Sequence, residues 1–100
     1  MYAYDPSADR WSFVTSLPTP RYPMSAGVIN GVIYTFGGGG GDGNRPGILE
    51  AYDPSTGTWS AKTPMPDWRE FVGVGVVNGM FYVAGGFSAG ALNTMEAYVP

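Results

Sequence analysis

The sequence predicts an all-β protein made of repeated units, each with four antiparallel strands. Residues 4–38 repeat 48 positions later without a gap, and 16 of the 35 paired positions are identical. Glycine and proline account for 16 and 9 of the 100 residues, which is typical of chains with many tight turns. Apolar spacing of three and four never persists for three turns, so no helix is expected. A repeat of this length indicates stacked units that bury their apolar faces against each other.

Each unit contains a predicted β-hairpin. Two short apolar runs flank an Asn-Gly pair in residues 26–36, and the pattern returns in residues 74–84. Asn-Gly accepts the positive φ angles of a type I′ turn. Both hairpins are almost continuously apolar, which favours strands that are covered on both faces. A glycine pair then ends the second strand in each unit, at Gly37-Gly38 and at Gly85-Gly86.

A third and a fourth strand follow the hairpin. The third is expected over residues 48–52 and runs into a turn at residues 53–57, and the fourth carries Trp59. With the hairpin strands labelled a and b, the chain reads c, d, a, b, c, d, a, b, c. We therefore expect three parts: strands c and d of a first unit, a complete unit with its leading loop, and a partial third unit, over residues 1–16, 17–62 and 63–100.

Residues that repeat at fixed positions are expected to serve packing or turns, because every unit needs them. Trp11 repeats as Trp59, and Tyr34 repeats as Tyr82, so all four are expected in the core. Asp5 and Asp53 each precede a proline. A carboxylate at such a position is expected to accept backbone N–H bonds within an Asx-type turn.

Composition excludes several classes of function. The net charge is −3 with five Lys and Arg, which argues against nucleic acid or an anionic membrane as a partner. Cysteine and histidine are absent, which excludes disulfides and Ser-His-Asp or Cys-His catalysis and leaves zinc or copper without favoured ligands. No apolar run approaches the roughly 20 residues of a membrane helix. No signal peptide is visible, and none of these observations fixes a compartment.

The glycine-rich run at residues 37–43 raises two alternatives. Gly38, Gly40 and Gly43 fit GxGxxG, but nucleotide binding by that motif needs a helix N-terminus. Asp42 with Asn44 offers oxygen ligands for calcium, but the tandem repeats of a calcium β-helix are missing. We expect a loop without cofactor or metal.

Asp67 and Glu70 form a pair of nearby carboxylates, the residue types that carry glycoside hydrolysis. One pair on a single loop is a weak signal for that chemistry. No catalytic residue is therefore assigned in this chain.

Four features together resemble the kelch repeat. They are Gly-Gly closing strand b, Tyr three residues before it, the Tyr-Asp-Pro turn, and Trp seven residues after its Tyr. The resemblance covers essentially the whole chain and implies blades of a β-propeller, with strand a lining the central channel and strand d outermost. Propellers close with about four to eight blades. About two blades of an incomplete propeller are therefore expected here.

Two blades leave apolar outer faces without cover, and such faces associate or aggregate. The expected partners accordingly include further kelch blades, either in the same chain as part of a larger propeller or in other copies of it.

The resemblance implies a non-catalytic protein-binding scaffold in which the d–a and b–c loops face a protein or peptide partner. The candidate contact residues are Arg21, Tyr22, Arg45, Trp68, Arg69 and Glu70. Because Arg21 and Arg69 repeat, each arginine has a second possible role, holding neighbouring backbone carbonyls instead of a partner carboxylate. Some kelch domains contact acidic peptides through a second basic residue two positions later, but Pro23 and Phe71 stand there.

The alternative function is that of a fragment of a kelch-propeller enzyme. Sialic-acid mutarotases and galactose-oxidase-type enzymes are the examples, and most of their catalytic residues would lie outside this chain.

Overall fold

A computed structural model describes residues 1–22, 24–39 and 47–100. These residues form three antiparallel sheets and no helix, which confirms the predicted all-β class. No helix long and apolar enough to cross a membrane occurs in these three segments.

The N-terminal hairpin contains β1 (Tyr2–Asp5) and β2 (Arg10–Phe13). The middle sheet has the order β3 (Ser25–Ile29), β4 (Val32–Phe36), β5 (Leu49–Asp53) and β6 (Thr58–Ala61), and the third sheet has the order β7 (Gly73–Val77), β8 (Met80–Ala84) and β9 (Met95–Tyr98).

The sheets are not closed into a ring, and the expected divisions at residues 16/17 and 62/63 fall between sheets. The assignment of these three parts as separate blades stays a proposal.

Both Asn-Gly pairs adopt the turn that the sequence predicts. Asn30 and Gly31 have φ angles of 51° and 75°, and Asn78 and Gly79 have 51° and 72°. Two consecutive positive φ angles are the requirement of a type I′ turn. The same dipeptide therefore sets the register of β3 on β4 and of β7 on β8.

The Tyr-Asp-Pro turns also repeat in geometry. The Asp53 carboxylate accepts hydrogen bonds from the Ser55 backbone N–H at 2.9 Å and from its hydroxyl at 2.6 Å. Asp5 and Ser7 make the same two bonds. The hydroxyl bond, then the backbone bond, lowers the pKa of each aspartate below its ordinary value.

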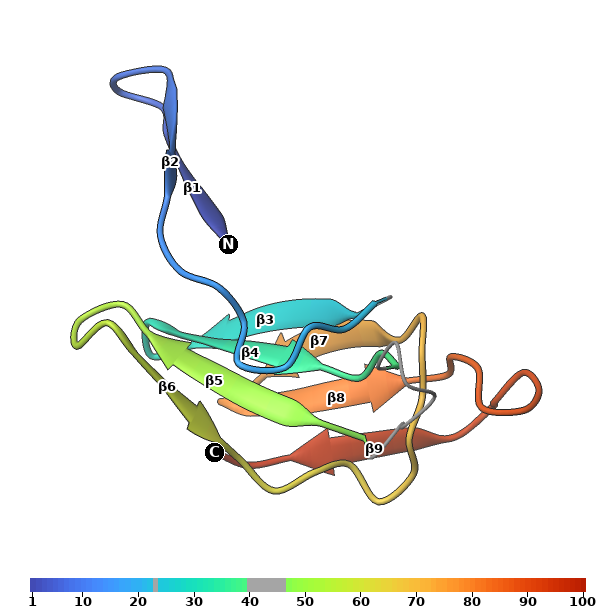
Figure 1. Cartoon of the computed structure of the whole chain (residues 1–100). Helices are drawn as coiled ribbons and strands as arrows, with labels where there is room; N and C mark the ends of the chain where they lie inside the picture. The colour runs from blue at the N-terminus through green and yellow to red at the C-terminus, as the bar shows by residue number, and fades with distance from the viewer. Residues whose placement is uncertain (23, 40–46) are drawn as a thin grey trace.

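The core lies between the middle and third sheets, whose innermost strands β3 and β7 run side by side (Figure 1). Phe81 of β8 is fully buried, with its ring 4.9 Å from the rings of both Tyr34 and Phe36. Gly27 makes this packing possible, because a Cβ there would lie 2.6 Å from Phe81 Cε1. The buried hydrophobic cluster consists of Ile29, Tyr34, Phe36, Leu49, Ala51, Met65, Val72, Phe81 and Val83.

The opposite face of the third sheet is open. Val77 and Met95 are 57% and 61% exposed, whereas their counterparts in the repeat, Ile29 and Leu49, are buried. The prediction that both hairpins are covered on both faces is therefore wrong. Val28 of β3 is 54% exposed, and no further sheet among the described residues packs on the outer side of β7. Tyr82, which was expected in the core, is only half-buried for the same reason.

The N-terminal hairpin projects away from the other two sheets (Figure 1). Every residue of its two strands is exposed. The prediction of a core position for Trp11 is wrong, since its side chain is 66% exposed; its ring packs on that of Tyr4, with the centroids 5.3 Å apart. Trp59 is half-buried, with its ring 5.2 Å from that of Tyr52. Each tryptophan thus packs on the tyrosine of the neighbouring strand. How much more of the tryptophan ring is buried depends on the other segments that pack against it.

Candidate functional site

The b–c and d–a loops meet at one end of the middle and third sheets, and we call this end the loop face. Two short antiparallel backbone pairings build it. Gly39 N–H donates to the Tyr22 carbonyl at 3.1 Å, and Tyr22 N–H donates back at 3.4 Å. Glu70 and Phe87 make the same reciprocal bonds, both at 2.9 Å. These pairs are 48 residues apart, so the backbone frame repeats while the side chains it presents differ.

The Gly-Gly pairs hold these loops close together. A Cβ at Gly37, where φ is 74°, would clash with the carbonyl oxygen of Arg69 in the next unit. Gly38 N–H donates to that same oxygen at 3.3 Å, which links the two units. Gly86, with φ of 96°, lies similarly against the carbonyl of Glu70. The glycine pair is required by this close approach as well as by the strand ending.

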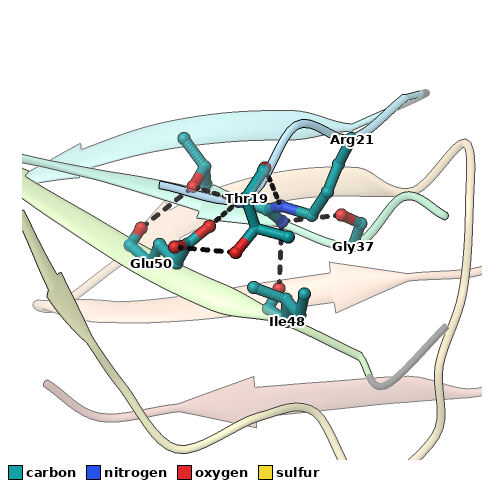
Figure 2. A network of polar contacts seen from close by, with 6 residues as sticks. Thr19, Arg21, Gly37, Ile48 and Glu50 are labelled. Atoms are coloured by element: carbon teal, nitrogen blue, oxygen red, sulfur yellow. Dashed lines mark hydrogen bonds and ion pairs between the residues drawn. The ribbon is translucent and has the colours of Figure 1, made fainter. Parts of the chain in front are cut away.

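Arg21 precedes the middle sheet, and its buried side chain binds the backbone of three segments (Figure 2). Its guanidinium donates to the carbonyl oxygens of Gly37 at 2.7 Å, Ile48 at 3.3 Å and Thr19 at 3.3 Å. These carbonyls belong to the end of strand b, the segment entering strand c, and the d–a loop. One side chain therefore fixes all three loop-face segments of this unit.

Glu50 balances the buried charge of Arg21. The two side chains form an ion pair at 2.9 Å, and Arg21 also donates to the Thr35 hydroxyl at 2.8 Å. The Thr19 hydroxyl donates to the other carboxylate oxygen of Glu50 at 3.3 Å, as Figure 2 shows. Burial lowers the pKa of Arg21, and the charge of Glu50 opposes this effect. The arginine remains cationic because its ordinary pKa is so high.

Arg69 plays the corresponding role in the third sheet and is fully buried. It donates to the carbonyls of Gly85 at 3.0 Å and Thr94 at 3.1 Å, and it pairs with Glu96 at 2.9 Å. Asp67 stands where Thr19 stands in the middle unit. Arg69 Nε and Glu96 Oε2 are buried and have no hydrogen-bond partner among the described residues.

The burial of both arginines corrects the prediction that they contact a partner. Their guanidinium groups face the protein interior, and Arg21 is only 9% exposed. The alternative interpretation agrees with the structure, because each arginine donates hydrogen bonds to neighbouring backbone carbonyls. Their contribution to the loop face is to position other residues.

The remaining candidates differ in accessibility. Tyr22 is 81% exposed and is the most accessible of the described set. Trp68 and Glu70 are half-buried and make contacts within the chain. Arg45 lies outside the described residues, as do the residues 40–44 on which the nucleotide and calcium alternatives depend.

Two phenylalanines on the loop face were missed as candidates. Phe71 is 70% exposed and has a φ angle of 54°, which is unusual for a bulky residue. Phe87 is 44% exposed. Their counterparts in the repeat are Pro23 and Gly39, so their failure to repeat was the signal that would have identified them.

No group of three or more His, Cys, Asp or Glu with the arrangement of a metal site occurs in residues 1–22, 24–39 and 47–100. The described part of the loop face presents exposed aromatic side chains, Tyr22, Phe71 and Phe87, on a hydrogen-bonded backbone.

Comparison with protein families identifies the repeat. The family model described as the Kelch motif matches residues 20–66 and 69–100. These two segments contain the middle and third sheets with their loops, which is most of the chain. A comparison with curated proteins found no match.

Proposed function

Because the chain belongs to the kelch repeat family, we propose that it is a non-catalytic scaffold whose loop face binds a protein or peptide. Kelch blades generally mediate interactions between proteins. No specific observation on the described residues favours the enzyme alternative.

The observation that carries this proposal is the exposure of non-repeating aromatic side chains on a repeated frame. Tyr22 and Phe71 are 81% and 70% exposed, and both stand at positions that differ between the two units. Aromatic side chains are common anchors of protein interfaces. The loop face therefore has the residue types that binding needs at the positions where the two units differ.

Backbone strain at Phe71 supports the same proposal. A bulky residue with φ near 54° is strained by roughly 1–3 kcal/mol. Such strain persists where surrounding structure imposes it, and it is concentrated at functional sites. Here the preceding residue, Glu70, is held by both of its backbone bonds to Phe87. The strained backbone thus keeps the Phe71 ring directed away from the core.

The frame beneath these side chains lowers the cost of binding. Arg21 and Arg69 fix the loop backbones from below, so less conformational freedom is lost when a partner docks. Binding through Tyr22 and Phe71 should then depend on the buried arginines without direct contact to them.

A displayed library of random peptides provides the test. Peptides selected on the immobilised full chain are re-measured against Tyr22→Ala and Phe71→Gly. We expect at least tenfold weaker binding to each variant. Glycine relieves the positive φ angle, so Phe71→Gly should leave the free energy of unfolding unchanged or raise it by about 1 kcal/mol.

Thr56→Ala is the matched control, because this residue is exposed on a turn at the opposite end of the middle sheet. Its affinity for the selected peptides should equal that of the unmodified chain. Equal binding to all three variants would show that the loop face is not the binding surface.

A further inference from the structure

The loop face of the third unit carries acidic or aromatic residues at five positions that do not repeat. They are Asp67, Trp68, Glu70, Phe71 and Phe87. The middle unit has Thr19, Pro20, Tyr22, Pro23 and Gly39 at the equivalent positions. The same backbone frame therefore presents different chemistry in the two units, and at these positions only the third unit has carboxylates.

Negative charge predominates in this part of the loop face. The charged residues of segments 63–72 and 85–94 are Asp67, Arg69 and Glu70. Arg69 is fully buried, and its ion pair with Glu96 balances its charge within the third sheet. The exposed Asp67 and the half-buried Glu70 therefore make this surface attractive to cations and repulsive to acidic segments.

Glu70 and Phe87 form a carboxylate–aromatic pair in this surface. Their backbones exchange two hydrogen bonds of 2.9 Å, so they are directly opposite residues of an antiparallel pairing. Side chains at such positions lie on the same side, with Cβ atoms about 4.5–5.5 Å apart. Tyr22 and Gly39 occupy these positions in the middle unit, so the pair is specific to the third unit.

Both members of this pair are accessible to a partner. Phe87 is 44% exposed, and its other backbone pairing is with Ala91, whose methyl group is too small to cover the ring. Glu70 is half-buried and has a contact within the chain. A carboxylate offers about four acceptor sites, so it can keep that contact and still accept hydrogen bonds from a second group.

An arginine side chain fits this pair better than a lysine side chain. The guanidinium group is planar, so it stacks on an aromatic ring while its edge donates parallel hydrogen bonds to a carboxylate. An ammonium group is a compact and strongly hydrated point charge. A ring and a carboxylate side by side therefore match the guanidinium group in both shape and charge.

We propose that the Glu70–Phe87 pair receives an arginine side chain of the protein or peptide that the loop face binds, an inference that rests on the proposed function. The guanidinium group stacks on the Phe87 ring and donates to the Glu70 carboxylate. Asp67 adds attraction at longer range. The third unit thereby selects for a cationic segment, while Tyr22 and Phe71 supply apolar contact area.

Peptides from the displayed library are the first probe, restricted to those that Tyr22→Ala or Phe71→Gly weakens. Each is compared with a version in which arginine is replaced by citrulline, which keeps the shape of the side chain and removes its charge. We expect about tenfold weaker binding from this replacement and from Glu70→Gln. Combining the two changes should cost no more than either alone, because both remove the same contact.

Two further variants separate the ring and the net charge. Phe87→Leu keeps an apolar side chain without an aromatic face and should weaken binding about threefold. Asp9→Asn is the matched control, because it removes one negative charge in the turn of the N-terminal hairpin, away from the loop face (Figure 1). Its affinity should equal that of the unmodified chain. Circular dichroism checks that every variant folds.

The outcomes distinguish this inference from the proposed function. Peptides that need Tyr22 but bind the Glu70→Gln variant with unchanged affinity would overturn the arginine contact and leave the proposed function standing. Fully additive losses from citrulline and Glu70→Gln would also overturn it.

N-acetylarginine amide is a second probe that does not depend on the library. Its titration should produce saturable shifts of the Glu70 and Phe87 amide signals in NMR spectra, and the citrulline analogue should produce none. Absence of these shifts with the arginine probe would overturn the inference.

Discussion

Position 19 and position 67 are equivalent in the repeat, yet they carry Thr and Asp. The Thr19 hydroxyl completes the hydrogen bonding of Glu50, whereas Glu96 Oε2 is left without a partner. A buried polar atom without a partner costs roughly 1–3 kcal/mol. One side chain thus makes the two buried arginine networks unequal.

Asp67→Thr should therefore stabilise the chain. The new hydroxyl is placed to donate to Glu96, and we expect the free energy of unfolding in urea to rise by about 1 kcal/mol. Asp67→Ala is the matched control, because it removes the charge without adding a donor. If alanine stabilises as much as threonine, charge repulsion rather than the missing hydrogen bond explains the effect.

The two aspartate turns give a pH prediction. The Ser55 hydroxyl bond is the largest cause that holds the pKa of Asp53 below its ordinary value. A lowered folded-state pKa means that this turn contributes stability above the unfolded pKa and loses it as the pH falls through the folded pKa. Ser55→Ala should raise the pKa of Asp53 toward its ordinary value, as measured by NMR titration of the carboxyl carbon. Asp5 in the same sample should not change, and a Ser7→Ala variant should show the reverse pattern.

At the scale of the strand, Trp11 and Trp59 occupy the same position of the repeat but are buried to different extents. Trp59 lies on the complete middle sheet and donates through its indole N–H to the Thr15 hydroxyl at 3.3 Å. Trp11 lies on the two-stranded sheet of β1 and β2, where its ring is mostly exposed. The strand pattern predicts the tyrosine contact of each tryptophan, but not how much of the ring is covered.

Alanine substitution of each tryptophan should reflect this difference. Trp59→Ala should lower the free energy of unfolding by about 2 kcal/mol, through loss of the Tyr52 contact and partial burial. Trp11→Ala should lower it by less than about 1 kcal/mol, because that ring is mostly in solvent. Urea titration of both variants provides the measurement. Equal losses would mean that the hairpin is covered in solution.

At the scale of the whole molecule, the space around Gly27 and Gly75 differs according to whether a neighbouring sheet packs against strand a. Gly27 is covered by Phe81, while a Cβ at Gly75 would meet nothing within 4 Å. Neither glycine has a positive φ angle, so only the packing differs. The two glycines occupy the same position of strand a, 48 residues apart.

Gly27→Ala should lower the free energy of unfolding by about 1–3 kcal/mol, because it overpacks the core. Gly75→Ala should leave the stability of the monomer unchanged. If further blades or other copies cover the open face as they cover Gly27, the same variant should weaken self-association, which analytical ultracentrifugation measures. A chain that stays monomeric at high concentration with Val77 and Met95 unmodified would contradict association through this face.

Much of the fold was predictable because its signals are local. Asn-Gly specifies a type I′ turn wherever it joins two apolar runs, and both such turns occur as expected. The candidate site was less predictable. Tyr22 is accessible, but Arg21 and Arg69 are buried, and Phe71 was passed over. From the sequence alone, an arginine before strand a could bind either a partner or a backbone carbonyl. Only the positions of Gly37 and Glu50 in the fold show that Arg21 binds within the chain.

The sequence by itself determined the all-β class, the 48-residue repeat and the order of strands along it, because turn residues and strand patterns act over a few residues. Only the tertiary structure decided which equivalent residues are buried. Tyr34 and Tyr82, Gly27 and Gly75, and Ile29 and Val77 each share a position, yet the first residue of each pair is covered more completely than the second. The physical reason is that burial depends on what packs over a face, and the repeat specifies the face without specifying its neighbour.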